Sequence, residues 1–183
     1  MTEATDILSR ATDALLKLAA DRPWREISLR DIAREAGLPL ADLYAQAASK
    51  LAVLAALSGA MDQAALATGA DSEDVHDRLF DATMARVEAM QPHRAALIAM
   101  ARGLADERGQ SALLAHLPRT ARAILEGAGL DATPPRRLAM TALWMRVVQV
   151  WRDDEGALNR TMAEIDKDLR VMRRRLGWIG AGF

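Results

Sequence analysis

The sequence contains no cysteine, which excludes disulfide bonds, thiolate metal sites and cysteine nucleophiles together. Aromatic residues make up only 4%, whereas alanine and leucine are abundant. This composition favours helices, because alanine and unbranched side chains lose little conformational freedom in a helix. The formal charge of −1 provides no overall positive field, so any nucleic-acid binding would depend on a local patch.

The sequence also lacks a run of about 18 apolar residues that could span a bilayer. Its first six residues, MTEATD, are polar and acidic, unlike a signal peptide. We therefore expect a cytoplasmic protein without a membrane partner. A chain of 183 residues is long enough for one sizeable core, or for a small head domain on a larger body.

Apolar residues recur at helical spacing along the whole chain, and no stretch alternates with a period of two. The sequence therefore predicts an all-α fold of about nine helices, separated by glycine and proline. We expect these helices at about 3–20, 28–36, 40–46, 49–67, 73–90, 93–107, 110–127, 134–153 and 156–176.

The first fifty residues outline a helix-turn-helix. Ser28 and Asp31 form a short capping-box pattern at the start of the second helix, and Gly37 is placed to end that helix. Pro39 suits the first position of the short helix that follows. Two short helices joined through glycine, behind a longer one, are typical of this motif. We predict a head domain at 1–48 and a second domain at 49–183.

One segment of this head carries a family resemblance. The elements, in order, are Trp24, Ile27-Ser28-Leu29, Ile32-Ala33, Ala36-Gly37-Leu38, Leu43-Tyr44, Lys50 and Leu54. Their order and spacing resemble the DNA-binding heads of TetR-family transcription regulators. The resemblance implies a three-helix helix-turn-helix head and a helical bundle that binds a ligand and dimerises through its last two helices. In the body, the Leu79–Met84 stretch, Pro92-His93-Arg94 and the helix with Trp144 and Trp151 resemble a TetR-like subgroup. That subgroup is related to ubiquinone-biosynthesis accessory proteins, which keep the fold but bind lipid.

The resemblance implies a set of residues for binding double-stranded operator DNA. Leu40 and Ala41 would face bases, whereas Tyr44, Lys50 and the Ser28 hydroxyl would contact phosphates. Gln46, on the same short helix, completes the candidate set. In the alternative reading, the Tyr44 ring packs in the core of the head.

The head departs from the family in places that concern DNA binding. Asp42 stands where a small hydroxyl residue usually precedes Leu-Tyr, and Ala47 stands where phenylalanine is usual. Residues 1–50 hold seven Lys or Arg and eight Asp or Glu, a difference of −1. Because non-specific affinity depends on neutralising phosphates, this head is expected to bind DNA weakly.

The expected helix at 134–153 is apolar nearly all round, which indicates packing on its own core and on a second chain. The resemblance places a homodimer interface at the last two helices. The candidate interface residues are Val147, Trp151, Met162, Ile165, Leu169 and Met172. Methionines suit adaptable apolar pockets, and the alternative for them is ordinary core filling. The candidate pocket for a small apolar or amphipathic ligand comprises Met84, Met100, Met140, Trp144 and Met145.

No catalytic or metal-binding pattern is present, so we expect neither an enzyme nor a cofactor. The basic run at Lys167, Arg170 and Arg173–Arg175 has two readings. It contacts anionic lipid, or it places cations where the helix dipole favours them.

Two functions remain open. The first is a ligand-responsive operator-binding regulator, and the alternative is a lipid or isoprenoid carrier of quinone biosynthesis that does not bind DNA.

Overall fold

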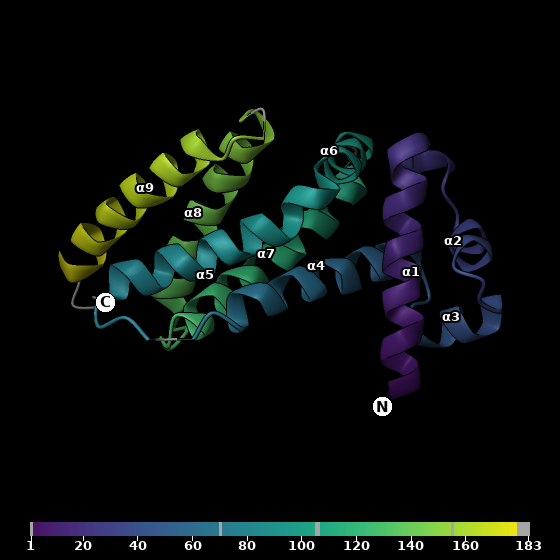
Figure 1. Cartoon of the computed structure of the whole chain (residues 1–183), viewed down its shortest axis with the longest axis horizontal. Coiled ribbons are helices and arrows are strands. Elements are labelled where there is room, and N and C mark those ends of the chain that lie inside the picture. The colour runs from purple at the N-terminus through teal and green to yellow at the C-terminus, as the bar shows by residue number, and fades with distance from the viewer. Residues whose placement is uncertain (1, 70, 105–106, 155, 179–183) are drawn as a thin grey trace. The chain divides into compact units, whose positions relative to one another are not determined.

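The computed structural model describes residues 2–69, 71–104, 107–154 and 156–178, in which the chain is helical and contains no strand (Figure 1). The described α-helices are α1 (Thr2–Asp21), α2 (Leu29–Glu35), α3 (Leu40–Gln46), α4 (Lys50–Leu66), α5 (Val75–Met90), α6 (Arg94–Gly103), α7 (Glu107–Gly127), α8 (Pro134–Arg152) and α9 (Asn159–Trp178). Short 3-10 helices, η1 (Trp24–Glu26) and η2 (Gln91–His93), precede α2 and α6. The all-α class and the nine predicted helices are confirmed.

Several helix ends differ from the predicted ones by up to four residues, and α7 begins at Glu107 in place of 110. Helix α6 ends at Gly103, before the expected 107, and α9 begins at Asn159, after the expected 156. Asp154 explains the late start of α9, because its carboxylate accepts hydrogen bonds from the Thr161 backbone N–H and hydroxyl, both at 2.7 Å. This contact holds the chain in a loop until α9 begins.

The helices group into two compact units. The N-terminal unit comprises residues 1–60 and 93–113, and the C-terminal unit comprises 61–92 and 114–183. This geometric grouping places α6 with the first helices of the chain. It does not test the functional boundary predicted after residue 48, which stays a prediction.

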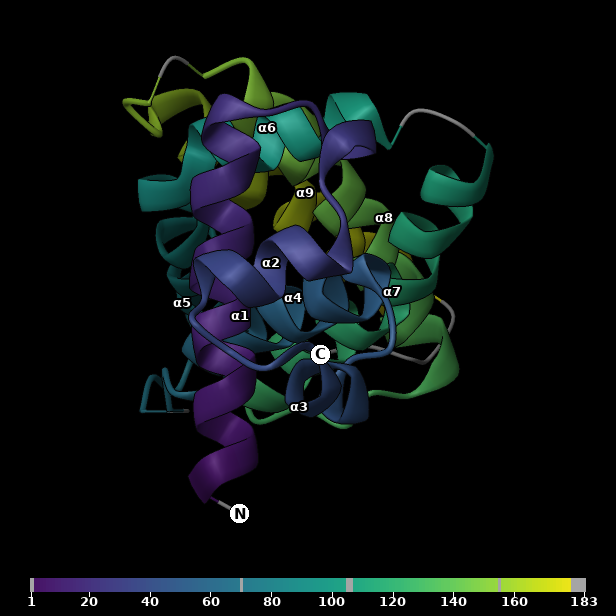
Figure 2. The ribbon, with the colours of Figure 1, turned by 90° about the vertical axis from the view of Figure 1, so that its right-hand side faces the viewer.

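In the N-terminal unit, α1 packs against α2, α3 and α6 (Figure 2). Leu15, Ile32 and Leu43 are fully buried between these helices. Trp24 and Ile27 are also buried, so the segment between α1 and α2 is fixed to the core, as the sequence predicts.

In the C-terminal unit, α9 packs against α8 and α5. Met140 and Val147 of α8 are fully buried, as is Ile165 of α9. Helices α4 and α7 approach closely at Gly127, where a Cβ atom would lie 2.0 Å from the Ala65 carbonyl oxygen. Only glycine fits this crossing, because a methyl group would overlap a backbone atom.

Candidate nucleic-acid interface and the α8–α9 groove

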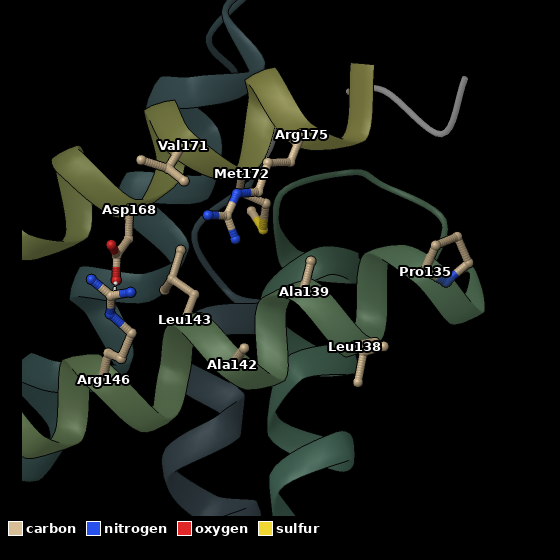
Figure 3. Close-up of a pocket in the computed structure, with 10 residues that line it drawn as sticks. All are labelled: Pro135, Leu138, Ala139, Ala142, Leu143, Arg146, Asp168, Val171, Met172 and Arg175. Atoms are coloured by element: carbon tan, nitrogen blue, oxygen red, sulfur yellow. Dashed lines mark ion pairs between the residues drawn. The ribbon is translucent and has the colours of Figure 1, made fainter. Parts of the chain in front are cut away.

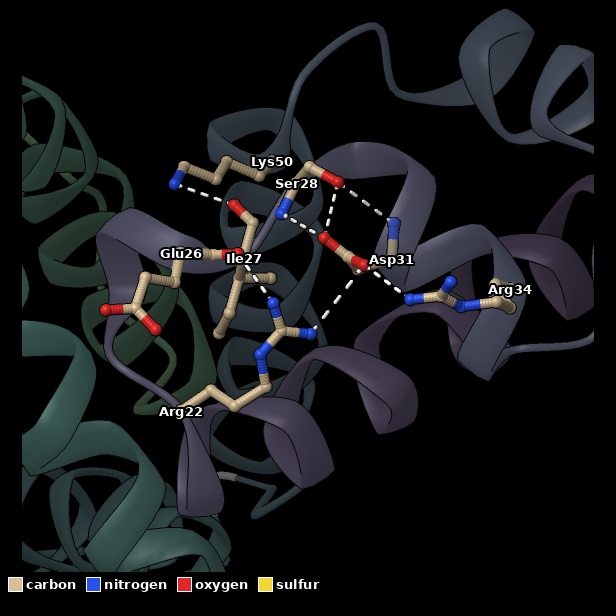
Figure 4. A network of polar contacts seen from close by, with 7 residues as sticks. All are labelled: Arg22, Glu26, Ile27, Ser28, Asp31, Arg34 and Lys50. Atoms are coloured by element: carbon tan, nitrogen blue, oxygen red, sulfur yellow. Dashed lines mark hydrogen bonds and ion pairs between the residues drawn. The ribbon is translucent and has the colours of Figure 1, made fainter.

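A capping box begins the helix-turn-helix, as predicted (Figure 4). The Ser28 hydroxyl accepts a hydrogen bond from the Asp31 backbone N–H at 3.1 Å, and Asp31 Oδ2 accepts one from the Ser28 backbone N–H at 3.0 Å. The same carboxylate accepts the Ser28 hydroxyl proton at 2.5 Å. These bonds from Ser28 lower the pKa of the Asp31 carboxyl. Because the Ser28 proton is already donated, a phosphate would have to compete with Asp31 for it.

The turn between α2 and α3 uses the glycine that the sequence singled out. Gly37 has φ +64°, a conformation that L side chains rarely adopt. Pro39 lies at the N-cap of α3, one position before the first helical position that the sequence predicted for it. Arg10 reaches from α1 and donates to the Ala36 and Gly37 carbonyls at 2.7 and 2.9 Å. The end of α2 is therefore fixed by α1 as well as by glycine.

Helix α3 is anchored by one side and exposed on the other. Leu43 is fully buried and Leu40 is half-buried, whereas Ala41 and Gln46 are exposed. Tyr44 is 60% exposed, so the reading in which its ring packs in the core is wrong. The single tyrosine of the chain lies on the outer side of this helix, available to a partner.

Lys50 faces inward. Its ammonium donates to the carbonyls of Trp24 and Ile27 at 2.7 and 2.8 Å, and it lies 4.6 Å from the centre of the Trp24 ring. These contacts join the start of α4 to η1 and to the residue before the capping box. The phosphate role that the resemblance implies for Lys50 stays a prediction, and it would require leaving these partners.

Most other cations of the head are paired within the chain. The further pairs are Lys17 with Glu35, Arg22 and Arg34 with Asp31, and Arg25 with Glu26. Arg30 is exposed, and among described residues up to 50 it is the one Lys or Arg for which the structure records no hydrogen bond or ion pair. The positive charge available to a phosphate backbone is therefore smaller than the count of seven cations indicates.

The two departures from the family pattern have local structural reasons. Asp42 is exposed in the first turn of α3, where a carboxylate interacts favourably with the helix dipole. Ala47 is buried directly after α3, where a small side chain ends the helix against the core.

The predicted pocket residues do not gather around one described cavity. Met84, Met140 and Trp144 are buried in the C-terminal unit, Met145 of the same unit is 44% exposed, and Met100 belongs to the N-terminal unit. Their assignment to a ligand pocket stays a prediction.

Trp144 instead covers a buried polar cluster that the sequence reading missed. Arg86 Nε donates to Asp62 Oδ1 at 2.7 Å, and the guanidinium lies 4.4 Å from the centre of the Trp144 ring. The Thr120 hydroxyl donates to the same Asp62 oxygen at 3.0 Å. Arg86 NH1 also lies 3.0 Å from the sulfur of Met90. The signal in the sequence was Asp62, a charged residue within the otherwise apolar stretch that forms α4.

The predicted dimer residues are mostly buried within their own chain. Only Met162, which is 41% exposed, reaches the surface of the protomer. The other five, all buried in the packing of α8 and α9, are Val147, Trp151, Ile165, Leu169 and Met172. The large apolar side chains that α8 exposes are different ones, namely Leu138 at 74% and Met145 at 44%.

A groove of about 410 Å³ runs between α8 and α9 (Figure 3). Its lining residues are Pro135, Leu138, Ala139, Ala142, Leu143, Arg146, Asp168, Val171, Met172 and Arg175. A second groove, of about 560 Å³, lies in the N-terminal unit between the end of α1, η1 and α6. Neither groove is lined by a predicted pocket residue.

Within the part of the chain that the structure describes, no three His, Asp or Glu side chains are placed to hold a metal ion. No single described helix is both long and apolar enough to cross a membrane; only the pair α3 and α4, bent by 62°, meets that criterion together.

The sequence matches no protein-family model. No curated protein matches it either. Solved structures do match. A TetR transcriptional regulator from Rhodococcus sp. RHA1 superposes with a TM-score of 0.70 at 16% identity, over 93% of this chain and 97% of that one. A TetR-family regulator from Streptomyces coelicolor gives 0.58 at 19% identity, over 99% and 83%. The fatty acid degradation regulator FadR from Bacillus halodurans gives 0.55 at 16% identity, over 90% and 93%. The chain has the fold of TetR regulators.

Proposed function

We propose that this protein is a DNA-binding transcription regulator of the TetR type that acts as a homodimer. The observation that carries the proposal is helix α3. It is anchored by fully buried Leu43 and held by a glycine turn, and it exposes Tyr44 to the outside. An exposed helix fixed behind a turn is the arrangement by which a helix-turn-helix reads the major groove.

In this proposal, Leu40 and Ala41 at the start of α3 face base edges, and the Tyr44 hydroxyl donates to a phosphate. Gln46, exposed near the end of α3, is a further candidate contact. Arg30 supplies the least encumbered positive charge. Because so few cations are available, phosphate contacts contribute little, and the affinity depends on close fit of α3 in the groove.

The homodimer is proposed to form through the exposed surface of α8 and α9. Leu138, Ala142 and Met145 follow one another at spacings of four and three residues and are all exposed, as is Met162 on α9. Such spacing produces one apolar stripe along a helix, suited to a partner helix. Two heads on a symmetric dimer would meet half-sites roughly 34–36 Å apart.

The effector is proposed to be a small apolar or amphipathic molecule that binds in the C-terminal unit. The likeness to FadR, named as a regulator of fatty acid degradation, supports this class of ligand. An effector can release DNA only through its different affinities for the two conformations, typically a coupling of about 1–3 kcal/mol.

Selection of bound fragments from genomic DNA, followed by titration of the selected site, tests the regulator. Tyr44→Ala should weaken specific binding at least about tenfold, and Tyr44→Phe by less, because the ring remains and one phosphate hydrogen bond is lost. Arg25→Ala is the control, since its side chain is exposed on the same unit but lies outside α3. Absence of any enriched fragment at about 50 mM salt, where phosphate contacts are strongest, would refute the proposal.

The second candidate is a lipid or isoprenoid carrier that keeps the fold without binding DNA. The observation that favours it is the exposed Asp42 on α3 together with the pairing of most head cations. Native mass spectrometry and lipid extraction of the purified protein test it. A co-purified lipid combined with no DNA binding would favour this candidate, whereas a lipid-free protein that binds no lipid would exclude it.

A further inference from the structure

The groove between α8 and α9 contains a carboxylate oxygen to which the described residues donate no hydrogen bond. The Asp168 side chain is 6% exposed. Arg146 Nε lies 3.0 Å from Asp168 Oδ2, yet within the described part of the chain this oxygen accepts no hydrogen bond, so the contact is an ion pair without a directed N–H. A buried acceptor left in this state carries a desolvation cost that a further donor would remove.

The groove also contains an arginine for which the described residues supply no acceptor. Arg175 is exposed, lines the same groove, and has no ion pair or hydrogen bond among the described residues. It lies seven residues beyond Asp168, about 10.5 Å along the helix axis, so the two side chains flank Val171. Figure 3 shows both groups on the groove side of α9.

Charge along α9 is divided between its two halves. In the first half the three carboxylates Glu164, Asp166 and Asp168 outnumber the two cations Arg160 and Lys167, whereas the second half carries four exposed arginines, namely Arg170, Arg173, Arg174 and Arg175. Two such helices side by side in parallel would place like charges against each other. In the antiparallel arrangement, each acidic half faces a basic half.

We propose that a second copy of this chain occupies the groove, with the two α9 helices antiparallel, so that Asp168 of each copy accepts a hydrogen bond from Arg175 of the other. The inference rests on the proposed homodimer and specifies how its two copies recognise each other. A two-fold axis that passes between Val171 and Met172 places Asp168 of each copy opposite Arg175 of the other, which gives two equivalent pairs. Both are lining residues of one groove, so one axis satisfies both pairs.

The groups around Asp168 agree with this assignment. It faces Arg146 of α8 and has Glu164 and Lys167 on its own helix. Burial raises the pKa of the Asp168 carboxyl, Arg146 and Lys167 lower it, and Glu164 raises it further. Arg146 is shared with Glu164 at 3.0 Å, so its charge is divided between two carboxylates. A guanidinium from the partner would supply both a donor and a positive charge.

The dimerisation constant is measured by analytical ultracentrifugation for wild type, Asp168→Asn, Arg175→Gln and the double variant. Each single change should weaken the dimer at least about tenfold, because each removes one member of both buried pairs. The double variant should be no more than about threefold weaker than either single variant, because the partners act together. Arg173→Gln, a matched exposed arginine that does not line the groove, should stay within about twofold of wild type.

The absence of cysteine provides a second measurement that does not depend on binding strength. Val171→Cys should form an intermolecular disulfide under mild oxidation, because facing Cα atoms at the axis lie within disulfide reach. Ala163→Cys, also on α9 but far from the axis, should not.

The outcomes separate this inference from the dimer itself. A monomeric wild type would overturn both. A dimeric wild type with additive effects of the two substitutions, or with cross-linking at position 163 in place of 171, would overturn the antiparallel pairing and leave the homodimer standing.

Discussion

The charged side chains of the two units are used differently. Around the helix-turn-helix they are mostly exposed and paired with one another, as Lys17 is with Glu35 and Arg34 with Asp31. In the C-terminal unit, Asp62 and Arg86 are buried as a pair, and Asp168 lines a groove without a full set of partners. Exposed pairs contribute little to stability, and they also reduce the charge available to a ligand. Under the proposed function, the head would bind DNA with few cations, while the groove on α8 and α9 would retain charge for a partner.

The largest effect is expected from the buried pair. Asp62→Ala should lower the free energy of unfolding by about 3–5 kcal/mol, because Arg86 would remain charged and buried without its carboxylate. The control is Glu126→Ala, which breaks the exposed pair with Arg122 and should cost less than about 1 kcal/mol. Chemical denaturation of both variants measures the difference. Equal losses would show that burial does not distinguish the Asp62–Arg86 pair from an exposed pair of the same unit.

A smaller effect is expected for the inward-facing lysine. Lys50→Met should lower the free energy of unfolding by about 2 kcal/mol, because two charge-assisted hydrogen bonds to carbonyls are lost. It should leave the salt dependence of DNA binding unchanged. If the slope of log K against log salt became less steep by about 1.8, which corresponds to one lost phosphate contact in each of two heads, Lys50 would contact DNA after all.

A still smaller effect is expected on α3. Asp42→Thr should raise DNA affinity roughly three- to tenfold at low salt, since removing a carboxylate near the phosphates removes a repulsion. The helix should lose about 0.3–1 kcal/mol of dipole stabilisation at the same time. Asp13→Asn is a control for the change in net charge, because Asp13 is exposed on α1. An equal gain in both variants would mean that overall charge, not the position of Asp42, sets the affinity.

The smallest effect concerns the capping box. The pKa of Asp31 is lowered from 3.8 by its bonds to Ser28, so its contribution to stability is present above pH 3.8 and is lost as the pH falls through the lower folded value. The difference in melting temperature between wild type and Asp31→Asn should therefore be constant near neutral pH and should shrink below 3.8. A difference that grows on acidification would contradict this assignment.

The positions of the helices could be predicted from local patterns. Ser28 caps α2, and Ser49 caps α4 through a hydrogen bond from the Ala52 N–H at 3.1 Å. The orientation of individual site side chains could not be predicted, because it depends on contacts with residues far away in the sequence. Lys50 turns inward because two carbonyls 23 and 26 residues away accept its protons.

The dimer face shows the same limit. Helical spacing correctly grouped Ile165, Leu169 and Met172 on one side of α9, but it could not say whether α8 of the same chain or a second chain covers that side. In the structure the protomer buries these residues itself. The side chains left exposed on α8, such as Leu138, are not the ones that the sequence predicted for the interface.

The most direct test of the account is the salt dependence of wild-type binding to a site selected from genomic DNA. With one or two available cations per head and two heads, the slope of log K against log salt should be about −2 to −4 between 50 and 200 mM. Specific binding with that shallow slope would support a regulator whose head cations are held by their own chain. A slope near −10 would show that the paired cations leave their partners for phosphate, and no binding at 50 mM would contradict DNA recognition by α3.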